Sequence, residues 1–489
     1  MNTLTPFDRR RRQLLQGGTG GLLSWCLPQS VLADSADELH TLVAKQARKL
    51  AGEQQVKLRM LIPAGSGENL IPVIAAFRKA SGIEVEIIES PVDDINTQLT
   101  LDSMSGDGTY DLALPATFGL PDLASSGAIL PLDDFAARYE PADFRKDVLF
   151  STGDSFDGEL YGFQADGDAY LMFYHKGLLN DPDEQKRYED QFGEALAIPD
   201  TWETLDQQMA WFHRPDKGLY GGVLFRNPGY LAWEWWVRFH AKGYWPLSAT
   251  LEPQIDCDAG VEALEAMIRA TSHQVPESRS LGLVDNWKRF SRGDVYCNIG
   301  WGGSQKYFNS SKSAMQGRLE YGPTPGGLVD DELLLTPYFN WGWNYVVTAN
   351  SQQAELAYLF ALYASSPHMS TLAVRQVGGF FDPIRPTHYD DEEIQKAYSK
   401  PFLDVHRQSL ESAIPDLYLA NQGQYYQTLG NWLDRAMAGQ VEPAEALANV
   451  SQHWQLINRQ SDMELQRERW LELREKYPEN VRRRLRDLS

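Results

Sequence analysis

The sequence is poor in cysteine, in basic residues and in long apolar runs. Only three cysteines occur in 489 residues, and no Cys-x-x-Cys pair or Cys/His cluster indicates a metal site. Lysine and arginine number 45 against 67 acidic residues, which gives a formal charge of −22. A chain this acidic lacks the basic face that phosphate backbones require, so we expect no nucleic-acid partner. No internal run approaches the ~20 apolar residues of a membrane helix.

The sequence motifs of common enzyme classes are also missing. The chain has no His-Glu-x-x-His zinc motif, no Gly-x-Ser-x-Gly nucleophile elbow, no P-loop and no dinucleotide-binding glycine motif after a strand. We therefore expect a binding protein rather than an enzyme, without cofactor or metal ion. Hydrophobic residues make up 43% and aromatics 11%, which indicates a well-packed globular protein, and the length predicts two or three domains.

The first 33 residues have the features of an export signal. Arg9–Arg12 form a basic region, Leu14–Leu27 a weakly apolar stretch, and Val31–Ala33 offer the residues that a signal peptidase recognises. Arg11 and Arg12, followed by Gln-Leu-Leu, resemble the twin-arginine export motif. We therefore expect export to the periplasm, in the folded state.

The three cysteines leave one question open. Cys26 lies in a sequence that loosely resembles a lipobox, but Trp25 stands where a small residue is expected, so we do not predict a lipoprotein. Cys257 and Cys297 are compatible with one disulfide in an oxidising compartment and equally with two buried thiols, because sequence does not give their geometry.

Strand and helix patterns after this signal predict an α/β fold. Val56–Ile62 alternates like a strand, Leu70–Ala80 has helical spacing and Ile83–Ile88 is a second strand. A strand, a helix and a strand at this spacing begin a parallel sheet, and ligands of such sheets lie beyond the carboxyl ends of the strands. The loops at this edge supply the candidate binding residues Ser66, Glu68, Asn69 and Thr117.

The segment from Asp157 to Lys176, DGELYGFQADGDAYLMFYHK, organises the rest of the chain. A short apolar run and the aromatic-rich strand Ala169–Tyr174 are joined by the acidic connector Gln164–Asp168. We interpret the connector as a crossing between two compact bodies. The cleft beside it is the expected ligand site, with Asp166 and Asp168 as candidate contacts.

These residues resemble a known family. The pattern Gly-x-Leu-Tyr-Gly, followed by a strand that ends Phe-Tyr-His-Lys, is similar to the hinge-crossing segment of the family 1 extracellular solute-binding proteins, the sugar-type receptors of ABC importers. Other segments fit this family in the same order between about Val56 and Leu456. They include Pro199–Leu205, Trp287–Ser304, Thr336–Val347 and Gly378–Pro386. No single motif is specific, but the ordered set is.

The resemblance implies a type II periplasmic-binding-protein-like fold. Its two lobes, each a central sheet flanked by helices, are joined by three hinge crossings. The division that we predict comprises a signal peptide (1–33), an N-terminal helix (34–55), a first lobe (56–164 and 343–413), a second lobe (165–342 and 414–458) and a charged, solvated helical tail (459–489) outside the family pattern.

The resemblance also implies a binding site. It places Asp168 at an acidic hinge position, Trp301 at a stacking aromatic of the second lobe, and Tyr425 near an aromatic of the third crossing. Aromatic faces cover the C–H faces of sugar rings, and carboxylates accept hydrogen bonds from neighbouring hydroxyls. The remaining candidates are Tyr230, Gly302, Trp341, Trp343, Asn344 and Arg385, the last with a structural ion pair as its alternative role.

Together these features predict the substrate-binding protein of an ABC importer. We expect a monomer that captures a sugar, oligosaccharide or polyol and delivers it to a membrane permease by hinge closure. Two alternatives stay open. A polyamine or another cationic solute also suits acids beside aromatic rings. A secreted glycosidase requires two carboxyl groups about 5–9.5 Å apart across the bond that it cleaves.

Overall fold

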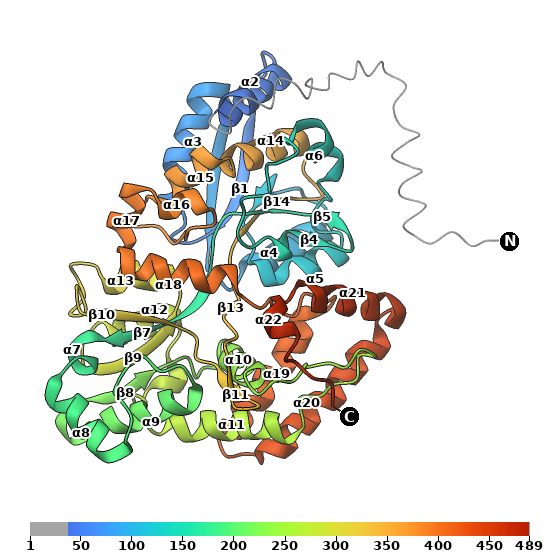
Figure 1. Ribbon diagram of the computed structural model, residues 1–489. Helices are drawn as coiled ribbons and strands as arrows, with labels where there is room; N and C mark the ends of the chain where they lie inside the picture. The colour runs from blue at the N-terminus through green and yellow to red at the C-terminus, as the bar shows by residue number, and fades with distance from the viewer. Residues whose placement is uncertain (1–37, 489) are drawn as a thin grey trace.

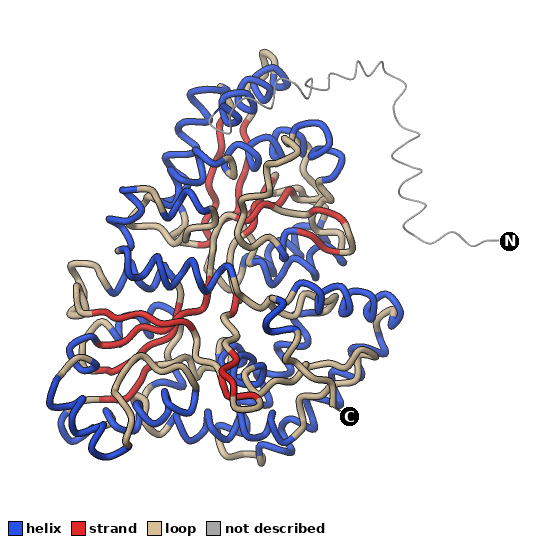
Figure 2. Tube along the Cα trace, in the orientation of Figure 1, coloured by secondary structure: helices blue, strands red, loops and turns tan. Residues whose placement is uncertain are grey.

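The computed structural model describes residues 38–488, which form two bodies, one above the other in Figure 1. The predicted signal peptide and Cys26 lie outside the described residues. Each body has its own sheet with helices around it, as the strands and helices of Figure 2 show. No helix between residues 38 and 488 has the length and apolar character needed to cross a membrane.

The first sheet has five strands in the order β2-β1-β3-β14-β6. Strand β1 pairs in parallel with β2 and β3, which confirms the predicted strand–helix–strand start, and β14 is antiparallel to both of its neighbours. The strands are β1 (Lys57–Pro63), β2 (Glu84–Ser90), β3 (Leu112–Ala113), β14 (Asn344–Val347) and β6 (Phe163–Gln164). A separate hairpin of β4 (Ser155–Phe156) and β5 (Glu159–Leu160) lies beside them.

The N-terminal helix covers an apolar helix of the first lobe. Helix α14 is apolar on nearly every side, and a helix of this kind must be buried all round. Helix α2 covers it and also packs on α3, so the N-terminal helix lies on the first lobe. The helices are α2 (Leu39–Ala51), α3 (Gly67–Ser81), α4 (Ile95–Ser105), α5 (Leu120–Ser125), α6 (Asp133–Tyr139), α14 (Ala354–Ala364), α15 (Pro367–Val374), α16 (Pro386–Tyr389) and α17 (Glu392–Tyr398).

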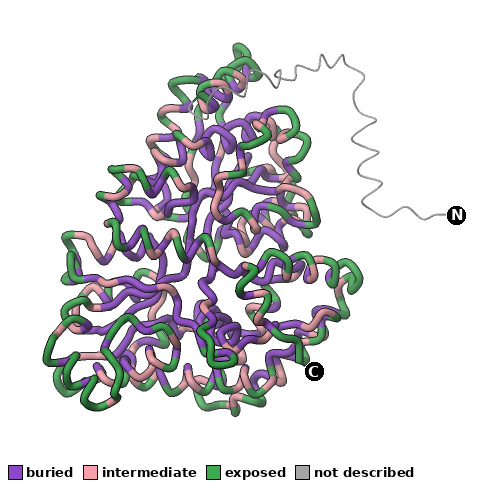
Figure 3. Tube along the Cα trace, in the orientation of Figure 1, coloured by how far each residue is buried: buried purple, intermediate pink, exposed green. Residues whose placement is uncertain are grey.

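The second sheet is built around β7 (Ala169–His175). Its order is β10-β7-β9-β8, with β13 also paired to β7. All but the last residue of β7 are buried, as expected for an apolar strand at the centre of a sheet (Figure 3). The other strands are β8 (Tyr220–Val223), β9 (Val295–Gly300), β10 (Leu319–Pro323) and β13 (Tyr338–Phe339), with a separate hairpin of β11 (Gly327–Val329) and β12 (Glu332–Leu334).

Helices cover this second sheet, and some of them extend the second lobe to one side (Figure 1). They are α7 (Lys176–Leu179), α8 (Pro182–Phe192), α9 (Trp202–Phe212), α10 (Leu231–His240), α11 (Asp258–Thr271), α12 (Leu283–Phe290), α13 (Gly302–Phe308), α18 (Lys400–Glu411), α19 (Gln422–Met437) and α20 (Pro443–Gln460). Helix α18 packs on β7 and β10, although the predicted division placed residues up to 413 with the first sheet.

Two crossings between the lobes run side by side. The first leads from β6 to β7 through residues 165–168, and the second leads from β13 to β14 through residues 340–343. Asn344 pairs with Gln164 at one end of the crossings and Phe339 pairs with Ala169 at the other, so the two segments are antiparallel neighbours. The chain passes between the lobes again where α17 leads into α18.

The C-terminal segment is helical, and several of its apolar side chains are buried rather than solvated. It comprises α21 (Met463–Lys476) and α22 (Glu479–Arg482). Trp470 is fully buried, packs edge-on against Trp245 and donates its Nε1 hydrogen to the Ser248 carbonyl at 2.9 Å. Arg484 donates to carbonyls of the β11–β12 hairpin. The tail is therefore attached to the second lobe.

Cys257 and Cys297 both carry free thiols. Cys297 lies buried in β9, and its thiol donates to the Gly221 carbonyl at 3.3 Å. Cys257 is half-buried and directly precedes α11. Of the two arrangements left open by the sequence, the structure has the free thiols.

Candidate functional site

A small cavity of about 40 Å³ lies between the lobes, beside the two strand crossings. A larger hollow of about 650 Å³ opens along α3 and β2 on the outside of the first lobe, but its lining has no convergent acids or rings. Binding sites combine apolar walls with a few convergent polar groups, so we take the interlobe cavity as the candidate site. It is lined by Val92, Asp166, Asp168, Leu283, Trp287, Trp301, Gly303, Trp341, Trp343 and Phe380.

The cavity is narrow in this structure. Its volume of about 40 Å³ is enough for no more than a few water molecules. A sugar-sized ligand therefore requires the lobes or the lining side chains to move.

Trp341 lies at the centre of a cluster of aromatic rings. Its ring centroid is 5.2 Å from that of Trp233, 5.3 Å from Trp301, 5.7 Å from Tyr230 and 5.9 Å from Phe118. Phe118 belongs to the first lobe and the other three partners to the second, so the rings meet across the cleft. The Trp341 Nε1 hydrogen is buried and has no acceptor.

Three buried carboxylates form the acid cluster, defined as Asp166, Asp168 and Asp382. One oxygen atom from each can be chosen so that all three lie within 4.8 Å of one another. Asp382 accepts hydrogen bonds from the Gly302 N–H at 2.7 Å and the Tyr398 hydroxyl at 2.6 Å. Its own N–H donates to Asp166 Oδ1 at 2.6 Å.

The acid cluster is electrostatically strained. Burial, followed by the negative charges of the neighbouring acids, raises the pKa values of Asp166 and Asp168 well above their usual range. The Asp166 Oδ2 atom is buried without a hydrogen-bond partner. Asp168 Oδ2 accepts from the Gly342 N–H at 3.1 Å.

Lys306 of α13 is a buried cation near these acids. Its ammonium donates to the carbonyls of Gln376, Gly379 and Phe381 at 3.0, 3.1 and 3.3 Å, rather than to a carboxylate. Burial lowers the pKa of Lys306 to about 8, although the charges of Asp382 and Asp166 favour the protonated form. The lysine therefore holds the first-lobe loop against the second lobe.

Two residues position the loop that carries Asp382. A Cβ atom at Gly302 would overlap the Asp382 carboxylate, so only glycine allows the N–H group to approach it. Asn69 accepts hydrogen bonds from the N–H groups of Phe380 and Phe381 and donates to the Ala373 carbonyl at 2.8 Å.

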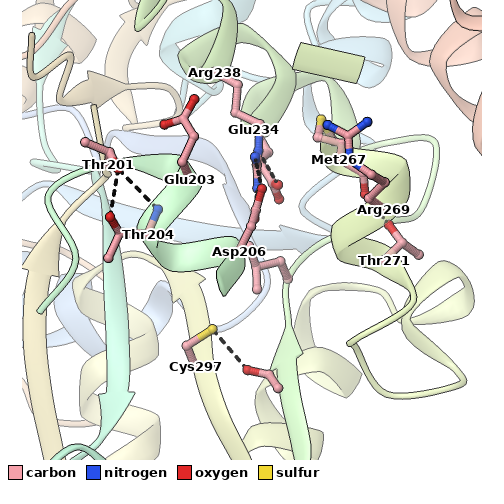
Figure 4. A network of polar contacts seen from close by, with 12 residues as sticks. Thr201, Glu203, Thr204, Asp206, Glu234, Arg238, Met267, Arg269, Thr271 and Cys297 are labelled. Atoms are coloured by element: carbon pink, nitrogen blue, oxygen red, sulfur yellow. Dashed lines mark hydrogen bonds and ion pairs between the residues drawn. The ribbon is translucent and has the colours of Figure 1, made fainter. Parts of the chain in front are cut away.

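A buried ion network anchors α10, which begins directly after Tyr230 and carries Trp233. Arg226 and Arg238 both donate to Glu234. Arg238 also donates to both oxygens of Asp206 at 2.8 and 2.7 Å (Figure 4). Burial alone would raise the pKa of Glu234, but the two arginines outweigh it and lower the pKa. The aromatic side of the cleft therefore rests on a fixed helix.

The structure brings some of the predicted site residues together and separates others. Those that line the cavity are Asp166, Asp168, Trp301, Trp341 and Trp343, with Tyr230 and Gly302 beside them. Seven lie elsewhere: Ser66, Glu68, Asn69, Thr117, Asn344, Arg385 and Tyr425.

The polar contacts of the separated residues are structural. Thr117 donates to Asn344 Oδ1 at 2.5 Å within the first lobe. Arg385 pairs with Asp147, which is the alternative role that the sequence left open. Tyr425 donates to Asn458 and packs edge-on against Trp454. Ser66 is buried and Glu68 exposed at the start of α3.

Several site residues were missed by the sequence analysis. Asp382, Phe380 and Trp287 all lie in segments that the family resemblance had marked, so that signal was present. Lys306 carried no signal, because a lysine on a short helix is ordinarily solvated.

Two sheet-centred lobes, joined by strand crossings and enclosing a cavity lined from both sides, define a two-lobed binding protein. The residues that line the cavity come from segments far apart in the chain. The chain belongs to the bacterial extracellular solute-binding protein family, whose model matches residues 73–401. The predicted family and the two-lobed α/β fold are confirmed.

The chain is similar in sequence and fold to known solute-binding proteins. The chain is 23% identical over 388 residues to the mannitol-binding protein of Pseudomonas aeruginosa, covering 73% of this chain and 82% of that protein. It is 22% identical to a probable amino-acid ABC transporter periplasmic-binding protein of Sinorhizobium fredii, covering 71% and 76%. The fold is similar to an ABC transporter solute-binding protein of Agrobacterium radiobacter in complex with ribitol, with a TM-score of 0.69, 19% identity and coverage of 82% and 98%.

Proposed function

We propose that this protein is the receptor of an ABC importer that captures a small sugar or polyol between its lobes. The observation that carries the proposal is the cavity, which Asp166 and Asp168 line together with the rings of Trp301 and Trp341. Carboxylates accept hydrogen bonds from hydroxyls, and ring faces cover C–H groups, so this combination suits a hydroxyl-rich solute. Relatives that bind mannitol and ribitol support the same class of solute.

Capture works by closure of the two lobes. The Tyr230 hydroxyl of the second lobe lies 3.4 Å from Asp93 Oδ1 of the first. Asp122 of the first lobe accepts hydrogen bonds from the Gln422 and Gly423 N–H groups of the second, both at 3.0 Å. Opening breaks these contacts, and a solute that contacts both lobes favours the closed state by its differential affinity.

The protein acts as a monomer in the periplasm, after export through the twin-arginine route, and presents the closed form to the membrane permease. It binds without catalysis. The chain has none of the common catalytic motifs, and it belongs to a family of solute-binding proteins, which supports binding over hydrolysis.

The test is calorimetry of the mature protein with mannitol, ribitol, sorbitol, glucose and maltose, combined with small-angle scattering. A cognate solute binds and compacts the protein, and Trp301→Ala or Asp168→Ala abolishes binding, whereas Asp216→Ala, at an exposed site, does not. If neither these solutes nor amino-substituted relatives of them bind or compact the protein, the proposal is contradicted.

A further inference from the structure

The acid cluster is not balanced by the protein around it. The three carboxyl groups can carry up to three negative charges, and their burial and mutual repulsion favour protonation of Asp166 and Asp168 when no cation is bound. The nearby Lys306 ammonium supplies one positive charge while bonding to carbonyls. Buried charges are costly unless they are paired. The cluster therefore lies where a further positive charge would be strongly favoured.

The hydrogen bonds show which atoms remain for a ligand. Both oxygens of Asp382 are already bound, to Gly302 and Tyr398, and Asp168 Oδ2 is bound to Gly342. Asp166 Oδ2 has no partner, and Asp166 and Asp168 are the two acids that line the cavity. A ligand can therefore donate hydrogen bonds to these two residues.

A second unpartnered group lines the same cavity on the aromatic side. Trp341 is 4% exposed, and its Nε1 hydrogen has no acceptor. An indole N–H only donates, so it requires an oxygen or another acceptor from the ligand. The ligand needs both a strong hydrogen-bond donor, for the acids, and an acceptor, for Trp341.

We propose that the solute carries a positively charged amino group on a hydroxyl-bearing carbon chain. The ammonium binds Asp166 and Asp168, with Asp382 behind them, and a hydroxyl oxygen accepts from Trp341 Nε1. This inference rests on the proposed function, in which the interlobe cavity is the solute site.

The walls of the cavity favour an organic ammonium over a metal ion. Calcium takes 6–8 oxygen ligands. Eight of the ten lining residues offer no side-chain oxygen, and five of those eight are tryptophan or phenylalanine. Aromatic faces attract alkylammonium groups, whereas they do not replace the oxygen ligands of a hard metal ion.

The test uses probes that differ at one group. The mature protein, treated with EDTA, is titrated by calorimetry with 1-amino-1-deoxy-D-glucitol against D-glucitol, and with 2-amino-2-deoxy-D-glucose against D-glucose. In at least one pair we expect the amino compound to bind at least tenfold more tightly. Asp166→Asn and Asp168→Asn should each bring the ratio near one, while Asp216→Asn should leave it unchanged. Near-UV circular dichroism checks that each variant is folded.

The other outcomes are distinct. If a neutral compound of either pair, or mannitol or ribitol, binds while no amino compound binds more tightly than its neutral partner, this inference is wrong and solute capture stands. If no compound binds, the proposed function falls as well. If calcium chloride stabilises the EDTA-treated protein and Asp166→Asn abolishes that effect, the acids belong to a metal ion and the inference is overturned.

Discussion

Asp122 supplies the helix cap of α19 from the opposite lobe. The N-cap residue of α19, Asn421, makes no side-chain capping bond of its own. Asp122, on α5 of the first lobe, instead accepts from the N–H groups of Gln422 and Gly423. When the lobes separate, these N–H groups must donate their hydrogen bonds to water instead. The substitution Asp122→Ala therefore acts on the closed state alone.

The magnitude follows from the bonds that are lost. Removing a capping side chain costs about 0.5–2 kcal/mol, and a carboxylate at a helix N-terminus adds about 0.3–1 kcal/mol. Part of this gain is offset, because burial raises the pKa of Asp122 in spite of the backbone N–H groups that lower it. We expect a net loss of about 1–2 kcal/mol, which changes the ratio of closed to open protein about 5–30-fold.

Small-angle scattering and calorimetry measure the two consequences. Without solute, Asp122→Ala should have a larger radius of gyration than the wild type, and its Kd for the cognate solute should rise by the same factor as the closed fraction falls. Asp122→Asn should lie between the two, and Asp134→Ala, at an exposed first-lobe site, should match the wild type. An unchanged Kd together with an unchanged radius would refute the reasoning.

Three further predictions concern the fold and the site. Glu234→Gln leaves the buried Arg226 without a carboxylate partner and Arg238 with Asp206 alone, so it should lower the free energy of unfolding by about 3–5 kcal/mol in urea denaturation. A loss below about 1 kcal/mol would contradict the burial of the network. Gly302→Val forces the Asp382 loop away, and calorimetry should show weaker solute binding. The control Gly282→Ala should keep the wild-type Kd, because the added carbon meets no atom within 4 Å. Burial raises the pKa of Asp154 to about 7, so this carboxyl favours folding at low pH and loses that contribution as the pH rises through 7. Chemical denaturation should therefore show a smaller decline of stability between pH 5 and pH 8 in Asp154→Asn than in the wild type, and equal declines would contradict the assignment.

Local patterns were sufficient to predict the frame of the molecule. The apolar run Ala169–Tyr174 is a strand because both of its faces are covered, and the acidic connector before it is a crossing because a polar segment joins two such strands. Both features depend on neighbouring residues, which a sequence displays directly.

Contacts between distant segments were not visible in the same way. The spacing of α18 marks one apolar face, but not which of two sheets that face will cover. Trp470 has few apolar neighbours in sequence, and its burial depends on Trp245, which lies far away in the chain.

The residues of the candidate site differ in the same way: some could be predicted from their neighbours in sequence, and others could not. Asp166 and Asp168 could be predicted because the crossing itself carries them. Asp382 could not, because the hydrogen bond that joins it to Asp166 spans 216 positions. Asn69 lies in the first turn of α3 and Arg385 directly precedes α16. Sequence alone does not distinguish a polar residue at such a position that contacts a ligand from one that holds a neighbouring loop.

The placement of the chain ends offers a direct readout of lobe movement. Helix α2 is fixed to the first lobe, and the last described residues are fixed to the second, where Arg486 forms a β-bridge with Tyr244. Fluorophores at the exposed positions Glu53 and Arg483, in a chain whose native cysteines have all been replaced, would convert the angle between the lobes into an energy-transfer signal. The two terminal extensions make the protein a scaffold for an optical sensor of its own solute.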